Sequence, residues 1–158
     1  MTLQQVIRAI EVVASKQPSV NMVVQNDIFR LNSCPDAKYG VFGWTQGQHS
    51  SSAASSLFTF SFTFIYVDRL LNDRSNQIEI QSVGIQTLDN ILRTLEDKGI
   101  EVTSSYSFQT FNQRFLDECA GVFCNVSLQV PVTILCGETY EVEIDDFSED
   151  FNDDFAIF

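Results

Sequence analysis

The only histidine of the chain, His49, stands directly before three serines, Ser50 to Ser52. A histidine beside a serine is the pair that generates a hydroxyl nucleophile, but this chemistry also needs an orienting acid and a rigid scaffold. The surrounding run from Thr45 to Ser56, TQGQHSSSAASS, contains no acid and is rich in glycine, serine and alanine. This composition predicts a long, mobile hairpin loop, so we expect no catalytic residue in it.

Cysteines are the other residues with reactive side chains, and there are four of them. They include no C-x-x-C motif, and the single histidine is far from them in the sequence, so the pattern does not predict a zinc site. The chain begins with the amphipathic run MTLQQVIRAIEVVASKQP, which lacks the basic region, apolar block and cleavage site of a signal peptide. We therefore expect a cytosolic origin, free structural thiols instead of two disulfides, no metal and no cofactor. The cysteines are Cys34, Cys119, Cys124 and Cys136.

Carboxylates are abundant but unevenly placed. The formal net charge is -12, and residues 138–158 hold nine acids and no base, which leaves 12 acids and 9 bases in residues 1–137. This distribution predicts one nearly neutral folded domain, residues 1–137, followed by an acidic arm, residues 138–158. No cluster of lysine and arginine forms the basic surface that nucleic-acid binding requires. No run of about 18 apolar residues is present either, so we expect no membrane span.

The acidic arm also contains apolar residues at helical spacing. Intervals of 3, 4, 4 and 3 residues separate Ile144, Phe147, Phe151, Phe155 and Phe158. If this arm is helical, these side chains form one apolar stripe opposite a face of carboxylates, which favours docking into a groove. The alternative is a disordered, solubilising tail, which the composition alone would favour. We prefer docking, because a solubilising tail has no need of phenylalanines at this spacing.

The fold that positions these side chains is organised around the run from Leu57 to Val67, LFTFSFTFIYV. Strict alternation places four phenylalanines and Tyr66 on one face, so it predicts a β-strand with an aromatic face. An aromatic face needs an apolar cover, and two amphipathic helices can supply it. The opposite face carries Thr59, Ser61 and Thr63 and no charge, which suggests that it lies against a neighbouring subunit.

The remaining elements follow from the same periodicities. Apolar residues at intervals of three and four predict a helix from Leu3 to Ala14, capped by Thr2 and ending near Lys16, and a second helix from about Ser75 to Lys98, stopped by Gly99. The predicted class is α+β: an antiparallel sheet of about five strands with two helices on one face, in the order α-β-β-β-α-β-β, plus the acidic C-terminal arm. The predicted strands are Asn21 to Leu31, Tyr39 to Thr45, Leu57 to Val67, Val102 to Phe115 and Gly121 to Val130.

Two features of this layout suggest contacts with other subunits. Ile80 and Val83 widen the apolar arc of the second helix beyond one core face, which is typical of a helix buried on two sides. For Asp68 and Arg69, with Asp73 and Arg74 nearby, we expect a cluster of salt bridges, either local or between subunits. The residues that we expect at subunit or partner interfaces are Gln46, Gln48, His49, Asp68, Arg69, Ile80, Val83, Ile144, Phe147, Phe151, Phe155 and Phe158.

Four runs of the chain are distinctive: NDIFRLN-x-x-PD-x-x-YG-x-F-x-WTQ, VDRL, SNQIEIQSVGIQTLDNI and FQTFNQRFLDECAGVFCNVS. Through these runs, residues 1 to about 135 resemble a small virion protein of tailed bacteriophages, especially crAss-like phages and other phages of gut Bacteroidetes. The most specific part of the resemblance is the FQTFNQRF…ECAGVFCNVS run. The order of elements is also similar to that of tail-terminator and head–tail joining proteins.

This resemblance implies a non-enzymatic virion protein, a ring-forming subunit of the phage neck or tail that surrounds the DNA channel. Its partners would be copies of itself and other neck or tail proteins, and DNA would pass through the ring without sequence-specific binding. Such a protein assembles in the reducing cytoplasm of the host. Two alternatives remain: another tail component, such as a tail-tube or minor tail protein, and a cytosolic module that binds a ligand or peptide on its phenylalanine-lined sheet.

Overall fold

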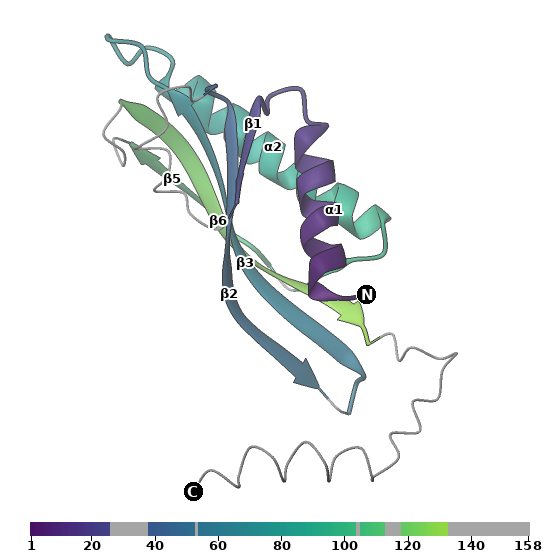
Figure 1. The fold of residues 1–158 in the computed structure, drawn as a ribbon. Coiled ribbons are helices and arrows are strands. Elements are labelled where there is room, and N and C mark those ends of the chain that lie inside the picture. The colour runs from purple at the N-terminus through teal and green to yellow at the C-terminus, as the bar shows by residue number, and fades with distance from the viewer. Residues whose placement is uncertain (26–37, 53, 104, 113–117, 133–158) are drawn as a thin grey trace, which may run out of the picture.

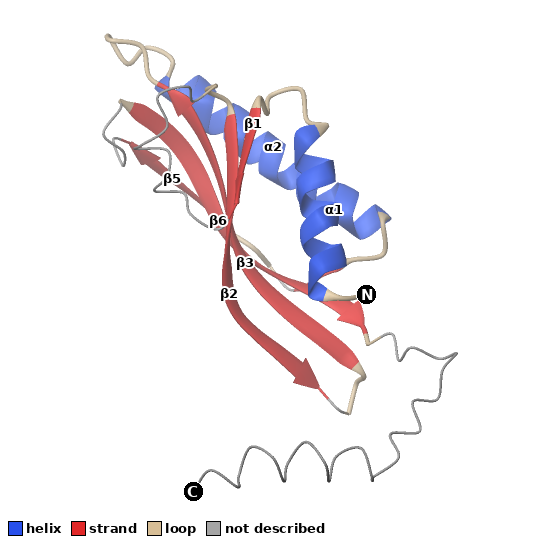
Figure 2. Ribbon diagram, in the orientation of Figure 1, coloured by secondary structure: helices blue, strands red, loops and turns tan. Residues whose placement is uncertain are grey.

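The computed structural model describes residues 1–25, 38–52, 54–103, 105–112 and 118–132. These residues form two helices and one twisted sheet, with both helices packed on the same face of the sheet (Figures 1 and 2). The elements are α1 (Leu3–Ser15), β1 (Met22–Gln25), β2 (Val41–Ser52), β3 (Leu57–Arg69), α2 (Gln77–Asp97), β4 (Glu101–Thr103), β5 (Phe108–Asn112) and β6 (Cys119–Pro131).

The α+β class is confirmed, but the sheet differs from the prediction in two respects. In the described part of the chain it has six strands in the order β1-β2-β3-β6-β4, with β5 also paired to β6, and β1 is parallel to β2 while the other pairs are antiparallel. Residues 104 and 113–115 of the predicted strand from Val102 to Phe115 lie outside the described residues, and the described part of it belongs to two strands, β4 and β5. From Thr103 to Phe108 the chain advances five residues, while their partners on β6, Ser127 and Cys124, are three apart, so one continuous ladder cannot form.

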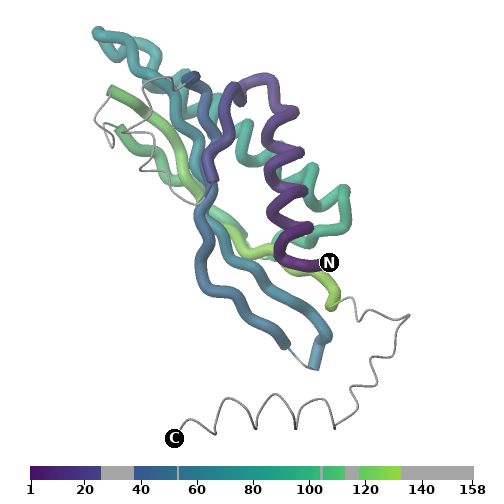
Figure 3. Tube along the Cα trace, in the orientation of Figure 1, coloured from purple at the N-terminus to yellow at the C-terminus, as the bar shows by residue number. Residues whose placement is uncertain are grey.

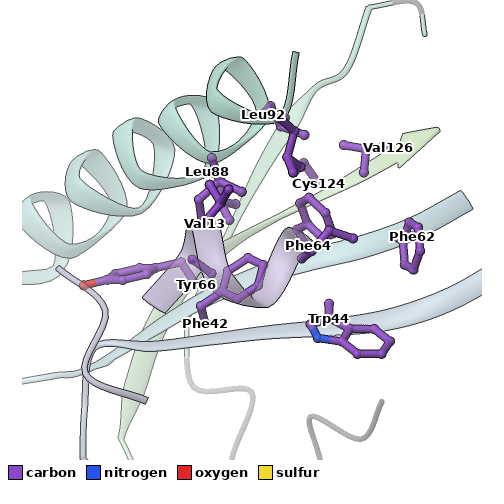
Figure 4. Packing of buried hydrophobic residues seen from close by; sticks show 14 of the residues in the cluster. Val13, Phe42, Trp44, Phe62, Phe64, Tyr66, Leu88, Leu92, Cys124 and Val126 are labelled. Atoms are coloured by element: carbon purple, nitrogen blue, oxygen red, sulfur yellow. The ribbon is translucent and has the colours of Figure 1, made fainter. Parts of the chain in front are cut away.

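The aromatic face of β3 is the centre of the core, as its alternation predicts. Phe60, Phe62, Phe64 and Tyr66 are all buried, and the inward-facing residues of β6 pack beside them (Figure 4). Phe64 contacts Phe42 of β2 edge to face, with ring centroids 5.4 Å apart. Helix α2 lies on β3 and β6, and α1 lies on α2 and β1. The residues that β6 contributes to the core are Val122, Cys124, Val126, Leu128 and Val130.

Helix α1 begins with the cap that its sequence predicts. The Thr2 hydroxyl accepts a hydrogen bond from the backbone N–H of Gln5, and the Gln5 side chain accepts one from the backbone N–H of Thr2 at 2.8 Å. This reciprocal arrangement provides partners for two backbone donors that the helix itself leaves unpaired. The C-cap of the helix is Lys16, two residues before Pro18.

Replacing Thr2 with alanine removes this cap, and we expect the free energy of unfolding to fall by about 1 kcal/mol. Urea unfolding followed by circular dichroism measures the change. Gln4→Ala is the matched control, because Gln4 is an exposed residue of the same first turn. Gln4→Ala should change the free energy of unfolding by no more than about 0.5 kcal/mol. Equal losses in the two variants would show that the cap contributes nothing specific.

The wide apolar arc of helix α2 is explained by contacts within a single chain. One side of the helix packs on the sheet and another side packs on α1, so the helix has two buried sides without a second subunit. Ile80 is 5% exposed and belongs to the core, and Val83 is half-buried against it. The helix ends as predicted, with Gly99 at φ +82°, a left-handed conformation that favours glycine.

Cys124 is a buried free thiol, and burial raises its pKa from the ordinary 9.0 to about 12. Above pH 9 the thiol ionises in the unfolded chain but stays neutral in the fold, so the fold loses stability as the pH rises toward 12. We expect this group to cost about 1 kcal/mol between pH 8 and pH 10. Urea titrations at both values, compared with those of Cys124→Ala, measure it. The variant should lose less stability over this interval, and equal losses would contradict the assignment.

Candidate interaction surface

Strand β2 extends through most of the segment predicted to be a mobile loop. That prediction is wrong for Thr45 to Ser52, which pair antiparallel with β3 as far as Ser52 opposite Leu57. The physical reason is that β3 offers a long, ordered ladder of backbone groups, and pairing with it does not require apolar side chains on β2. The ladder shifts between Gln46 and His49, where Gly47 and Gln48 together oppose one residue of β3, as in a β-bulge.

His49 lies on the aromatic side of the sheet and takes part in packing. Its ring centroid is 5.4 Å from that of Phe60 and 5.9 Å from that of Phe62. Its Nε2 atom is 3.1 Å from Oε1 of Gln46, and its buried Nδ1 atom has no hydrogen-bond partner among the described residues. Its neighbour Ser50 pairs with Thr59, on the opposite face of the sheet. This geometry does not orient a serine nucleophile on the imidazole.

The opposite face of the sheet carries a group of uncharged polar side chains, which we call the neutral face. Its members on β3 and β6 are hydrogen-bonded across the strands. The Thr63 hydroxyl donates to Oδ1 of Asn125 at 2.7 Å, and the Gln129 amide donates to the Thr59 hydroxyl at 3.3 Å. The hydroxyl oxygens of Ser61 and Ser127 are 3.2 Å apart. The neutral face is Thr59, Ser61 and Thr63 of β3 with Asn125, Ser127 and Gln129 of β6.

These cross-strand hydrogen bonds fix the orientation of short side chains that still have free bonding capacity. Once Oδ1 of Asn125 accepts from Thr63, the amide nitrogen of Asn125 keeps two donors. Asn125 is exposed and the other five residues are half-buried, so the polar atoms lie at the surface. The neutral face is therefore an ordered array of donors and acceptors with no formal charge.

A shallow depression of about 260 Å³ opens on this face beside Gly47 of the bulge. A β-carbon added at Gly47 would lie 3.3 Å from Cβ of Ser61, so glycine keeps the floor of the depression low. Hydroxyl and amide groups supply its polar lining. The residues around the depression are Gly47, Ser61, Phe62, Thr63, Asn125, Val126 and Ser127.

The predicted cluster of salt bridges around Asp68 and Arg69 takes a different form. Asp68 accepts a hydrogen bond from the backbone N–H of Arg69 at 2.7 Å, and the Arg69 guanidinium lies 5.6 Å from the ring centroid of Tyr39. Arg74 instead forms a long ion pair with Glu118, with Nη2 of Arg74 4.0 Å from Oε1 of Glu118. Asp73 accepts from the backbone and hydroxyl of Ser75, and these bonds lower its pKa. Within the described residues, these charges therefore form separate local contacts.

The other residues expected at interfaces have different outcomes. Gln46 and Gln48 are exposed on β2, whereas Ile80 is buried in the core, so the prediction that it lies at an interface is wrong. Residues Ile144, Phe147, Phe151, Phe155 and Phe158 lie outside the described residues. The sequence reasoning missed three exposed apolar side chains among the described residues: Ile78 at 77%, Leu71 at 55% and Val12 at 41% exposure. Spacing alone could not have found Ile78, because it stands seven residues before Ile85 and therefore continues the apolar stripe of α2 on a helical wheel.

No protein-family model matches the chain, and no curated protein matches it. Within the described residues, no three histidine, cysteine or acidic side chains are grouped so that they could hold a metal ion. Neither described helix combines the length and hydropathy that crossing a membrane would demand.

Proposed function

We propose that this protein is a non-enzymatic structural subunit of a tailed-bacteriophage virion that assembles into a ring in the neck or tail. The observation that carries the proposal is the neutral face of the sheet. The chain has a net charge of -12, so copies of it repel one another wherever their acids approach. A surface without charge is where such copies can come into contact at the lowest electrostatic cost, and interface centres are depleted of charged residues.

The geometry of the neutral face also suits a partner. Cross-strand hydrogen bonds hold Ser61, Thr63 and their β6 neighbours in place, so little side-chain entropy is lost on binding. Contact between this face and a different surface of the next copy generates a ring when the rotation between copies closes, and an open filament when it does not. Contact between two identical faces would give a dimer instead. The resemblance to tail-terminator and head–tail joining proteins favours the ring.

The acidic composition agrees with a passage for DNA. A ring subunit with 21 acids and 9 bases does not hold phosphates, so DNA can move through the channel. The subunit would assemble in the host cytoplasm with other neck or tail proteins. The alternative, a module that binds a ligand on its phenylalanine-lined sheet, has less support, because Phe64 and Tyr66 are buried under the helices.

Size-exclusion chromatography with light scattering tests the proposal on the full chain of 17.8 kDa. We expect a particle of several subunits that dissociates on dilution, and negative-stain images that show closed rings. A species that stays monomeric up to millimolar concentration would contradict assembly. A dimer without rings would contradict the ring and favour contact between two identical faces.

A further inference from the structure

The start of helix α2 carries an apolar side chain that its own chain leaves uncovered. Ile78, Ile85 and Leu92 stand seven residues apart, so they lie on one stripe of the helix. Ile85 packs against the core and Leu92 is fully buried, whereas Ile78 is 77% exposed. Leu71, in the turn before the helix, is also exposed. Among the described residues, Ile78 and Leu71 are the two most exposed large apolar side chains, and we call them the apolar end.

The apolar end is held in place by hydrogen bonds within the turn between β3 and α2. Oδ1 of Asn76 accepts from the backbone N–H of Leu71 at 2.9 Å, and Asp73 accepts from the backbone N–H of Ser75 at 3.1 Å. The turn contains one acid, Asp73, and one base, Arg74, so it has no net charge. A partner that binds it therefore loses little conformational entropy to order the turn and meets no net repulsion.

The depression on the neutral face suits an aliphatic side chain. Its volume is about 260 Å³. An apolar cavity of about 150 Å³ holds a benzene molecule, so the depression has room for an isoleucine side chain. The hydroxyls of Ser61, Thr63 and Ser127 already have hydrogen-bond partners across the strands, so an aliphatic group docked on them leaves none of them unpaired. The exposed Asn125 beside them keeps two donors for the polar rim of a contact.

The apolar end does not reach the depression of its own chain. Along β3, Ser61 and Arg69 are eight residues apart, which is about 26 Å, and Leu71 lies beyond Arg69. The depression also lies on the face of the sheet opposite to the helices, whereas Ile78 belongs to α2. Figure 3 shows the turn before α2 at the upper end of the molecule and the far half of β2 and β3 running toward the lower end.

We propose that Ile78, with Leu71 beside it, docks into the depression of the neutral face of a second copy. This inference rests on the proposed function, because it names the surface of the next subunit that meets the neutral face. Every copy carries both surfaces, and neither has a net charge, so they can meet without the repulsion that a net charge of -12 causes elsewhere. The contact joins one end of a subunit to a different part of the next, which is the head-to-tail arrangement that a ring requires.

Replacing Ile78 with asparagine removes the apolar group without changing the net charge. We expect the subunit dissociation constant of the full chain, measured by concentration-dependent light scattering, to rise at least about tenfold, because the buried isoleucine side chain is lost from the contact. Val12→Asn is the matched control, since Val12 is an exposed apolar residue of α1, and it should leave the constant unchanged. Urea unfolding of Ile78→Asn should match that of the unchanged protein, because Ile78 is mostly exposed.

A mixing experiment identifies the two surfaces that meet. Thr63→Lys disables the depression and keeps the apolar end, whereas Ile78→Asn disables the apolar end and keeps the depression. At a concentration at which each variant alone is monomeric, we expect an equal mixture to form a species with one chain of each kind. Native mass spectrometry identifies this species, because the two chains differ in mass. Nothing larger should form, because the two surfaces left over are both altered.

The outcomes that would overturn this inference differ from those that would overturn the proposed function. Equal dissociation constants for Ile78→Asn and Val12→Asn would exclude the apolar end from the contact. A mixture that stays monomeric would show that the apolar end and the neutral face do not meet. In both cases, rings of the unchanged protein would leave the proposed function intact. If the unchanged protein stays monomeric up to millimolar concentration, the proposed function and this inference both fail.

Discussion

Replacing Phe64 with alanine is expected to lower the free energy of unfolding by about 3–5 kcal/mol, the range typical of a buried phenylalanine. Phe64 has no exposed surface, contacts Phe42 and Phe62, and lies opposite Cys124 in the ladder. Truncation therefore removes apolar contacts and leaves a cavity at the centre of the sheet. Because small domains are stable by only about 5–15 kcal/mol, this single change consumes a large share of the stability. Urea unfolding measures it.

The matched control is Phe58→Ala, on the same strand and the same face. Phe58 is half-buried near the end of the sheet and stacks on Phe60 with ring centroids 5.8 Å apart. We expect a loss of about 1 kcal/mol, because part of the ring already contacts water. If the two variants lose equal stability, the aromatic face is not covered as described.

The second large effect concerns assembly. Thr63→Lys places a charge in the middle of the neutral face and removes the hydroxyl that holds Asn125. If this face is buried between subunits, the charge is buried without a partner, which costs about 2–5 kcal/mol and raises the subunit dissociation constant by about 30-fold or more. Concentration-dependent light scattering measures the shift. The substitution makes the net charge less negative, so weaker assembly cannot arise from added repulsion between acids.

Two controls distinguish the effect of changing position 63 from the effect of adding a positive charge anywhere on the protein. Thr63→Ser keeps the hydroxyl and should assemble as the unchanged protein does. Gln4→Lys adds the same charge on the exposed side of α1 and should also leave assembly unchanged. Normal assembly of Thr63→Lys, in a variant whose unfolding curve shows a native fold, would exclude the neutral face from the interface.

The parts of the fold that are local in the sequence could be predicted. The alternation of residues in β3 predicts its aromatic face. Thr2 predicts the start of α1, and Gly99 predicts the end of α2. The spacing of apolar residues predicts which side of α2 is buried. Each of these signals comes from a residue's own neighbours in the chain. Periodicity and capping chemistry are therefore sufficient to find them.

Pairing between distant strands could not be predicted in the same way. The run from Gln46 to Ser52 lacks the β-branched and aromatic residues that mark strands, and it is a strand because β3 lies beside it. The parallel pairing of β1 with β2 joins residues that are 19 positions apart in the sequence. The division of Val102 to Phe115 into β4 and β5 follows from the register of β6.

Only part of the candidate surface could be predicted from the sequence. The alternation of β3 places Thr59, Ser61 and Thr63 together, and that of β6 places Asn125 and Ser127 together. Their combination into one face requires the register between the two strands, which pairs Thr63 with Asn125. The bulge at Gly47, which opens the depression beside them, depends on the pairing of β2 with β3.

The most direct test of the central claim is the accessibility of the neutral face before and after assembly. Asn125→Cys places a thiol at its exposed residue, and Gln4→Cys places one on the exposed side of α1. Maleimide labelling is followed at concentrations below and above the assembly midpoint, with the labelling of the unchanged protein subtracted. We expect Cys at position 125 to react at least about tenfold more slowly in the assembled state, while position 4 reacts equally in both. Equal labelling of position 125 in both states would contradict the claim that subunits meet at the neutral face.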